Sequence, residues 1–273
     1  MIKEEKLLSL RKYIKEKRPL VHCITNPISI NGCANMILAV GARPIMAEHP
    51  LEVEEITSSA EALMLNLGNI TDVRMESMKR SLRIARERKI PVILDLVGIS
   101  CSRLRRKFAQ ELYEIGGIWI LKGNMSELLT AAGLPSHSIG VDAGKEDALG
   151  EHNFFKTAEA FNRLARTHGC VVMASGKEDL IADGSQVYLV GNGGEMLSGI
   201  TGSGCMQGAL GAAFLTGKDP LHAAVLGAVL MGEGGELAQE QAKGPGSFQA
   251  ALLDEIAGIS DSRFLEMARI RQG

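Results

Sequence analysis

The sequence of 273 residues is poor in aromatic side chains, which make up 4% of it and include a single Trp. It also has no excess of positive charge, because 30 Lys and Arg residues stand against 32 Asp and Glu residues, for a formal net charge of -2. Nucleic acids and anionic bilayers are bound largely through clustered positive charge. We therefore expect neither as a partner, and small polar ligands suit this composition better than stacked bases.

Long apolar runs are absent as well. The longest, at residues 223–231, stops far short of the roughly 18 residues that a membrane-spanning helix needs. The first 19 residues read as a charged amphipathic helix without the apolar core of an export signal. Five cysteines without a C-x-x-C pair and six scattered histidines indicate neither a disulfide framework nor a zinc site. A cytoplasmic location with reduced thiols is the expectation.

The composition is otherwise that of a folded protein, with 45% hydrophobic and 23% charged residues. A chain of 29.2 kDa favours one large domain, here residues 1–273, over two small ones. Short apolar runs alternate with helical stretches such as Asp72–Arg88 and residues 151–167. The runs expected to be strands are residues 20–25, 44–47, 62–67, 91–97, 117–121 and 170–174. This alternation predicts an α/β fold with a mainly parallel sheet and helices on both faces.

The pattern changes in the last third of the chain. Asp179–Ala182 and Val187–Val190 flank the dipeptide Asp183-Gly184, which suits a tight hairpin turn, so antiparallel strands are expected at the edge of the sheet. From Gly202 onward the sequence predicts helices, one to about residue 215, one over 221–241 and one that starts near residue 247, after a Gly-Pro-Gly break.

A glycine-rich turn at residues 199–205, GITGSGC, leads directly into the first of these helices. Positions without side chains let several backbone N–H groups converge, and the helix dipole adds partial positive charge, so an anion is expected to dock there. The alternative is a flexible loop before a close-packed helix, and these residues alone leave both open. The turn is neither a Walker A loop nor a G-x-G-x-x-G fingerprint.

Cys205 falls in the first turn of that helix, where the dipole is expected to lower its thiol pKa from about 8.5. It could be a nucleophile, a base or a bystander, since a buried Cys is more often a small hydrophobe. Asp95 and Glu127 follow strands, where open α/β sheets bind ligands, and two carboxylates suit a magnesium nucleotide. A carboxylate in this position also frequently caps the next helix, which applies to Glu127 above all.

Polar side chains at the ends of other strands could bind a heterocycle. His22, Thr25 and Asn26 follow the first strand, and Asn66 with Gly68 follows the third, although Asx turns are the simpler explanation of the amides. Met46 ends the second strand and could pack on a flat ligand, or simply fill the core.

In their order and spacing these segments resemble the hydroxyethylthiazole kinase family, a branch of the ribokinase-like superfamily, over roughly residues 18 to 255. The matching segments are VHCITN (21–26), AN (34–35), GARPIM (41–46), LNLG (65–68), LD (94–95), VG (97–98), GNMSE (123–127), GVD (140–142), SG (175–176), TGSGC (201–205) and GPGSF (244–248). No single piece is diagnostic, but the set is highly specific.

The resemblance implies a ribokinase-like three-layer fold and transfer of the ATP γ-phosphoryl group to the hydroxyl of 4-methyl-5-(2-hydroxyethyl)thiazole, in thiamine biosynthesis or salvage. It also implies a homotrimer with active sites at subunit interfaces. By the resemblance, Cys205 lies beside the reacting hydroxyl, Asn26, Met46 and Gly202 bind substrate, Lys122 and Ser175 contact ATP, and Asp95 and Glu127 hold Mg²⁺. Met46 would reach its pocket from an adjoining subunit.

Several positions depart from the family pattern: Cys23 replaces Asn, Cys33 replaces Thr, Leu96 replaces Pro, Lys122 replaces Arg, and Ser203 replaces Thr. Lys122 keeps the charge but loses the bidentate guanidinium, which loosens or rearranges its contact with ATP.

Two other functions compete. One is another ribokinase-like activity, such as a hydroxymethylpyrimidine kinase or a repair dehydratase of hydrated nicotinamide cofactors, both of which usually carry Asp where Cys205 stands. The other is a non-catalytic protein that binds nucleotide or thiazole. The joint presence of Asp95, Glu127 and the glycine turn argues against it, because binding a neutral heterocycle requires none of them.

Overall fold

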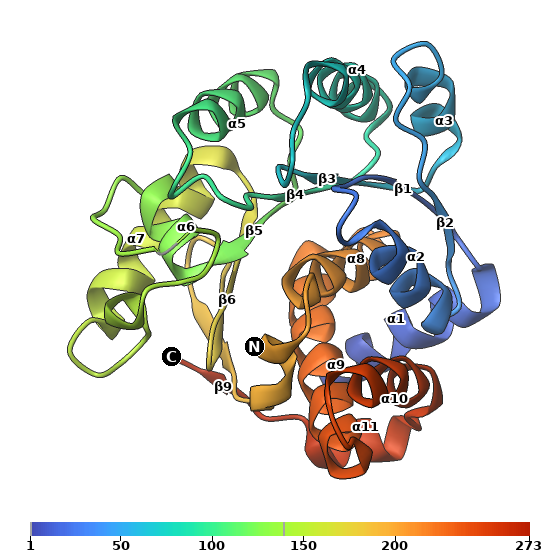
Figure 1. Ribbon diagram of the computed structural model, residues 1–273, viewed down its shortest axis with the longest axis vertical. Coiled ribbons are helices and arrows are strands. Elements are labelled where there is room, and N and C mark those ends of the chain that lie inside the picture. The colour runs from blue at the N-terminus through green and yellow to red at the C-terminus, as the bar shows by residue number, and fades with distance from the viewer. Residues whose placement is uncertain (1, 139) are drawn as a thin grey trace.

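The computed structural model describes residues 2–138 and 140–273, and these form a nine-stranded sheet flanked by helices (Figure 1). The strands are β1 (Leu20–Ile24), β2 (Arg43–Ile45), β3 (Ala62–Asn66), β4 (Val92–Asp95), β5 (Ile120–Asn124), β6 (Val171–Ser175), β7 (Asp179–Ala182), β8 (Val187–Val190) and β9 (Ile270–Gln272). They lie in the order β2-β1-β3-β4-β5-β6-β7-β8-β9. The first six are parallel and β7, β8 and β9 are each antiparallel to their neighbours.

Helices cover both faces of the sheet, which gives the three layers expected of a ribokinase-like fold (Figure 1). One face carries α1 (Glu4–Lys17), α2 (Ile30–Ala39), α8 (Ser203–Leu215), α9 (Pro220–Gln241), α10 (Pro245–Gly258) and α11 (Asp261–Met267). The other carries α3 (Val53–Ser59), α4 (Asp72–Arg88), α5 (Arg103–Ile115), α6 (Met125–Ala131) and α7 (Phe154–His168). Two short 3-10 helices, η1 (Lys145–Asp147) and η2 (Glu195–Gly199), lie in connecting segments.

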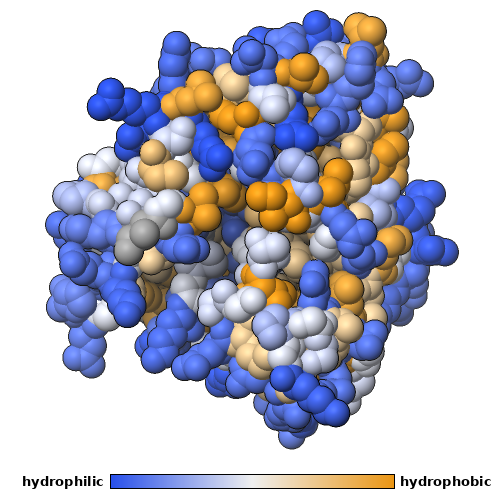
Figure 2. Space-filling view, in the orientation of Figure 1, coloured by the Kyte–Doolittle hydropathy of each residue, from blue (hydrophilic) through white to orange (hydrophobic). Residues whose placement is uncertain are grey.

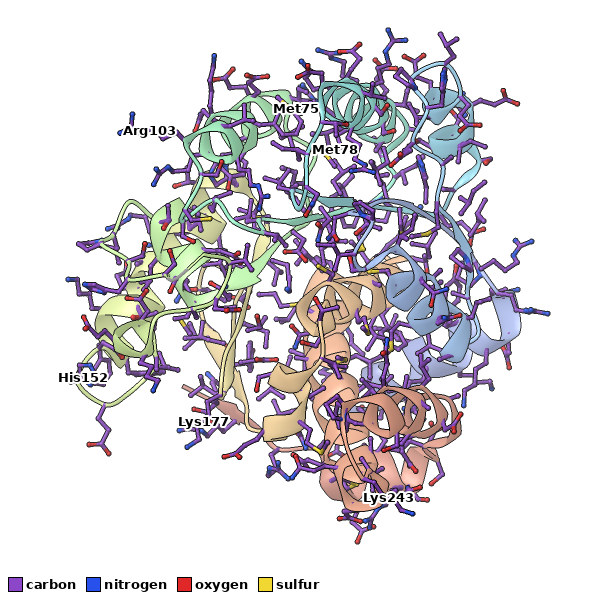
Figure 3. The ribbon with its side chains drawn as sticks, viewed as in Figure 1. Met75, Met78, Arg103, His152, Lys177 and Lys243 are labelled. Atoms are coloured by element: carbon purple, nitrogen blue, oxygen red, sulfur yellow. The ribbon has the colours of Figure 1, made fainter. Side chains whose placement is uncertain are left out.

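Two hydrophobic cores result, one on each face of the sheet. Along β3, Ala62 and Met64 join the core beneath α8, whereas Leu63 and Leu65 join the core beneath α4, as the alternation of side chains along a strand requires. Figure 3 shows the same division at the helices, where Met78 points from α4 toward the sheet and Arg103 extends from the outer surface. The strands are therefore mostly apolar, and most of their polar residues lie near their ends, although His22 and Lys122 lie inside β1 and β5.

Small residues let α8 pack against both the sheet and α9. A Cβ atom on Gly227 would lie 3.0 Å from the backbone nitrogen of Gly211, and one on Gly208 would lie 3.1 Å from the end of Met64. Every residue of α8 from Cys205 to Leu215 is buried. The close approach brings the first turn of α8 to the carboxyl ends of β3, β4 and β5, which is where the polar residues of the strands are found.

Most expected elements are confirmed, with shifted boundaries. The mainly parallel sheet, the hairpin of β7 and β8 and the helix Asp72–Arg88 appear as predicted. The antiparallel edge is confirmed, and it contains one strand more than the hairpin, because β9 pairs with β8 outside it. The helix expected from residue 247 begins at Pro245, since proline is accommodated in a first helical turn. Within the described residues, no helix combines the length and apolarity needed to cross a bilayer.

Candidate active site

Polar residues from four neighbouring segments meet at the carboxyl ends of the parallel strands, against the start of α8. The strand register places Asn66 beside Asp95 and Asp95 beside Lys122. Asn26 follows β1, and Cys205 comes from the first turn of α8. The space-filling view shows the surface hollowed between the positions of β5 and α8 (Figure 2). The structure thus brings together Asn26, Asp95, Lys122 and Cys205 with Asn66, which the sequence also offered as a polar residue at a strand end.

Two amide side chains surround the sulfur of Cys205. The Nδ2 atom of Asn66 donates to Cys205 Sγ at 3.2 Å, and the Nδ2 atom of Asn26 lies 3.5 Å from the same sulfur. Asn26 also uses its Oδ1 to accept from the backbone N–H of Ile28 and of Ser29 at 3.1 Å each. The Asx turn weighed from the sequence is therefore present at Asn26, and its NH₂ group also lies beside Cys205.

Asp95 and Lys122 form a buried ion pair, with Lys122 Nζ 3.4 Å from Asp95 Oδ2. Burial raises the pKa of Asp95, and Lys122 and Asn66 oppose that rise. Burial lowers the pKa of Lys122, but the acidic groups around it, Asp95 foremost, outweigh burial and raise it above its usual value. The ammonium group therefore stays charged and supplies fixed positive charge beside the start of α8.

The thiol of Cys205 does not have the lowered pKa expected from its place on the helix. Burial and the nearby carboxylate of Asp95 raise its pKa, and Lys122 counters them only in part. The expectation of a favoured thiolate is wrong because it considered the helix dipole and not the depth to which α8 is buried. At neutral pH the residue is present as the thiol.

Gly202 caps α8 in the left-handed region, with φ of +81°. A Cβ atom on Gly202 would come within 2.9 Å of the Ser29 Cβ atom, so glycine is required both by the backbone and by the neighbour. Among the described residues, no side chain caps the N-terminus of α8. Lys122 Nζ lies 3.1 Å from the point that a Cβ on Gly204 would occupy. Open N–H groups and an ammonium group thus meet at one point, which favours the docking of an anion over a flexible loop.

Glu127 has the capping role that was weighed against metal binding. Its Oε2 accepts from the backbone N–H of Asn124 at 2.7 Å, and the Asn124 side chain accepts from the Glu127 N–H at 2.9 Å. Its Oε1 accepts from the N–H of Gly98 at 2.7 Å. Burial, followed by the charge of Asp95, raises the pKa of Glu127 to about 7. A cation nearby would shift this carboxyl group toward its ionised form.

The donor set fits a magnesium ion held partly by phosphate. Asp95 Oδ1 is buried and has no hydrogen-bond partner among the described residues, which leaves an acceptor for a ligand. Magnesium usually takes one or two carboxylates and completes its shell with water and phosphate oxygens. Within residues 2–138 and 140–273 there is no group of three or more His, Cys, Asp or Glu side chains that could hold a metal alone. Asp95 therefore suits a metal that arrives with a nucleotide, whereas both oxygens of Glu127 already accept from backbone N–H groups.

The remaining predicted residues lie around this cluster. Ser175 ends β6 opposite Asn124 and its hydroxyl donates to Gly123 O at 3.4 Å, so it lies at the same edge of the sheet. Met46 follows β2, the outermost strand on that side, and is only partly buried. Both ring nitrogens of His22 already have partners, Thr57 Oγ1 and Ala47 O, each at 2.9 Å, which disfavours the ligand contact weighed for it from the sequence.

The pair Asp179 and Gln207 was not among the site residues predicted from the sequence. Gln207 Nε2 donates to Asp179 Oδ2 at 2.6 Å, and Asp179 Oδ1 accepts from the N–H of Gly176 at 2.9 Å. Burial raises the pKa of Asp179 to about 6. The available signal was a carboxylate three residues after Gly176 of the SG segment, at the start of the next predicted strand. A cavity of about 630 Å³ near Trp119 and His168 lies at the opposite, amino end of the strands.

The fold is that of ribokinase-like proteins. A ribokinase-like superfamily protein of Enterococcus faecalis V583 shares the fold, with a TM-score of 0.62 over 93% of this chain and 94% of that chain at 13% identity. More specifically, the chain belongs to the hydroxyethylthiazole kinase family, whose model matches residues 11–262.

Two relatives illustrate the closeness of the match. "Hydroxyethylthiazole kinase 2" of Clostridium botulinum (strain Kyoto / Type A2) is 49% identical over 263 residues, which cover 96% of this chain and 99% of the relative. The solved structure of a hydroxyethylthiazole kinase protein from Pyrococcus horikoshii OT3 has a TM-score of 0.88 at 33% identity, and the match covers 98% of this chain and 99% of that one.

Proposed function

We propose that the protein transfers the γ-phosphoryl group of ATP to the hydroxyl of 4-methyl-5-(2-hydroxyethyl)thiazole, giving the thiazole phosphate for thiamine biosynthesis or salvage. The observation that carries the proposal is the meeting of Cys205, Asp95 and Lys122 at the uncapped start of α8, in a chain of the hydroxyethylthiazole kinase family. These groups offer an acid, a cation and backbone N–H donors at one point, as phosphoryl transfer requires.

The residues act mainly through position and charge. Phosphoryl transfer has a loose transition state, so strong deprotonation of the alcohol is not required. The N–H groups at the start of α8 face the charge that develops on the transferring group, and Lys122 adds to their effect. Cys205 lies beside the hydroxyl as a thiol whose sulfur is fixed by two amides, a role that suits its raised pKa.

Asp95 and Glu127 would hold Mg²⁺ with the phosphates of ATP. Asp95 Oδ1 has an unused acceptor, and Glu127 is close enough to Asp95 for the charge of Asp95 to raise its pKa. A bound magnesium ion supplies positive charge that neutralises the phosphate oxygens. Ser175 would contact ATP from the end of β6, next to the Gly176 N–H that Asp179 orients.

The resemblance further supports a cytoplasmic homotrimer of one kinase domain, residues 1–273, in which Met46 serves the pocket of a neighbour. Edge strand β2 and the exposed apolar side chains of Ile28, Leu38 and Leu51 near it offer a surface for such contacts. If the pocket is shared, a form of the protein shown to be monomeric by light scattering should bind the thiazole weakly. Tight binding by a monomer would contradict the role of Met46.

A coupled assay of ADP release tests the function, with hydroxyethylthiazole, hydroxymethylpyrimidine or no acceptor added. We expect turnover with the thiazole alone and a product heavier by one phosphate in mass spectrometry. Turnover with the pyrimidine alone would indicate the other kinase activity. Binding of thiazole or nucleotide without turnover would indicate the non-catalytic alternative.

A further inference from the structure

Asn66, the last residue of β3, is completely buried and uses all of its hydrogen-bonding capacity at the site. Its Nδ2 donates to Asp95 Oδ2 at 3.0 Å and to Cys205 Sγ at 3.2 Å. Its Oδ1 accepts from Asn26 Nδ2 at 3.0 Å and from the N–H of Gly68 at 2.9 Å. An amide has two donor hydrogens and two acceptor lone pairs, so no capacity is left over.

The direction of this amide is fixed by its surroundings. The backbone N–H of Gly68 can only donate, so the oxygen of Asn66 must face it and the NH₂ group must face Asp95 and Cys205. Gly68 also has to lack a side chain, because a Cβ there would lie 2.7 Å from Asn26 Nδ2 and 2.9 Å from Asn66 Oδ1. The turn after β3 is therefore shaped around this one orientation.

We infer that Asn66 is a positioning residue for phosphoryl transfer, because its NH₂ group holds the sulfur of Cys205 and the carboxylate of Asp95 at one fixed separation. The inference rests on the proposed function. Asn66 is enclosed by the other site residues and acts through Cys205 and Asp95 instead of touching ATP. Its removal should therefore lower kcat more than it raises the KM of either substrate.

A double-mutant cycle on kcat tests the inference, with Asn66→Ala, Cys205→Ala and the double variant. Loss of a hydrogen bond to a charged group lowers a rate by about 10- to 100-fold. We therefore expect kcat of Asn66→Ala to fall by that order and its KM values to change by less than about threefold. If Asn66 acts partly through Cys205, adding Asn66→Ala to Cys205→Ala should cost clearly less than Asn66→Ala costs on its own, because only the hydrogen bond to Asp95 is then left to lose. Losses that multiply would overturn the inference, as would an unchanged kcat in Asn66→Ala.

Asn66→Asp separates positioning from packing. It keeps the shape of the side chain and an oxygen for Asn26 and Gly68 but leaves at most one donor, the O–H of a protonated carboxyl, so it cannot hold Cys205 and Asp95 together and should lose kcat as Asn66→Ala does. Asn162 provides a matched control, since it is buried on α7 and its Oδ1 accepts from the N–H of Gly184 at 3.0 Å. Asn162→Ala should leave kcat unchanged and combine additively with Cys205→Ala. Full activity in a folded Asn66→Asp protein would show that shape alone matters and would overturn the inference.

A crystal structure of Asn66→Ala supplies a result that does not depend on turnover. We expect the Cys205 side chain to leave the rotamer of the wild-type protein, because the donor from β3 that fixes its sulfur is gone. The same rotamer in both crystal structures would overturn the inference. An inactive wild-type protein with a displaced Cys205 in the variant would instead overturn the proposed function and keep the positioning role.

Discussion

Asp95 and Glu233 are both fully buried carboxylates, yet their surroundings differ completely. Asp95 Oδ2 accepts from Asn66 and lies 3.4 Å from the ammonium group of Lys122. Glu233, in the middle of α9, has no hydrogen bond to either oxygen among the described residues. Arg11 is close enough to influence it, but its Nε and Nη2 donate to Asp261 and to Ile259 O.

This difference in hydrogen bonding and ion pairing indicates which of the two carboxylates serves function and which affects only stability. A buried carboxylate that is paired and hydrogen-bonded keeps its charge available for chemistry, whereas one without partners avoids the cost of burial by staying protonated. Burial raises the pKa of Glu233 to about 8. We therefore expect changes around Asp95 to affect turnover first, and a change at Glu233 to affect stability alone.

The largest effect on turnover should come from Gly202→Val. Valine at φ of +81° is strained, and its side chain would meet Ser29 and block the approach to the start of α8. Since loss of one preorganised N–H donor costs about 100- to 1,000-fold in kcat, we expect a loss of at least about 100-fold in the ADP-release assay. Cys205→Ser should lose less.

Gly169→Val is the matched control for that variant. Gly169 also has a positive φ, +62°, but nothing lies within 4 Å of the position of its Cβ atom. It should lose stability through the same kind of backbone strain and keep its kcat. Equal activity of Gly202→Val and the wild-type protein would contradict the role of the turn.

Lys122→Met would remove the charged partner of Asp95 and leave a buried carboxylate without an ion pair, as Glu233 is. Removing one partner of a buried ion pair costs about 3–5 kcal/mol of stability, because the other charge is left uncompensated. We also expect the KM for ATP to rise by about tenfold, as the loss of one charge-assisted contact implies. Urea unfolding and ATP titration measure the two effects. Lys122→Arg keeps the charge and serves as the control, and unchanged stability in Lys122→Met would show that the pair contributes nothing to folding.

Local sequence patterns predicted the part of the fold that local patterns determine. The strands and the hairpin of β7 and β8 follow from apolar runs and from Asp183-Gly184, and these are confirmed. Strand β9 could not be predicted, because three residues at Ile270–Gln272 carry no periodicity and pair with a strand about 80 positions earlier along the chain. Its existence depends on the position of the helices before it.

The residues of the candidate site could be predicted from the sequence, but the pKa shifts of these residues could not. Asp95 and Asn66 are marked by their place at strand ends, and Cys205 by the glycine turn before it. The raised pKa of Cys205 and the contact of Asp179 with Gln207 depend on how deeply α8 is buried, which is a property of long-range packing. The commitment of His22 to Thr57 and Ala47 is of the same kind.

Glu233→Gln should affect turnover least of all and stability in a pH-dependent way. The unfolded Glu233 loses its proton near pH 4.5, and the folded one holds it until about pH 8. Because the folded pKa is raised, the stability contributed by the protonated group is complete below pH 4.5 and is lost as pH rises toward 8. Glutamine cannot ionise, so the variant should be more stable than the wild-type protein by up to about 3 kcal/mol at pH 7, and by less than about 1 kcal/mol at pH 5.

Urea unfolding at pH 5, 6, 7 and 8 measures that difference, and Glu240→Gln is the control because Glu240 lies on the same helix but is exposed. The control should follow the wild-type protein at every pH. Turnover of Glu233→Gln should be unchanged, since none of the charged groups that influence Glu233 belongs to the site: they are Arg11, Glu236, Arg263 and Arg269. A constant difference between Glu233→Gln and wild type across this pH range would mean that Glu233 is already ionised in the fold. The contrast with Asp95 would then have to be abandoned.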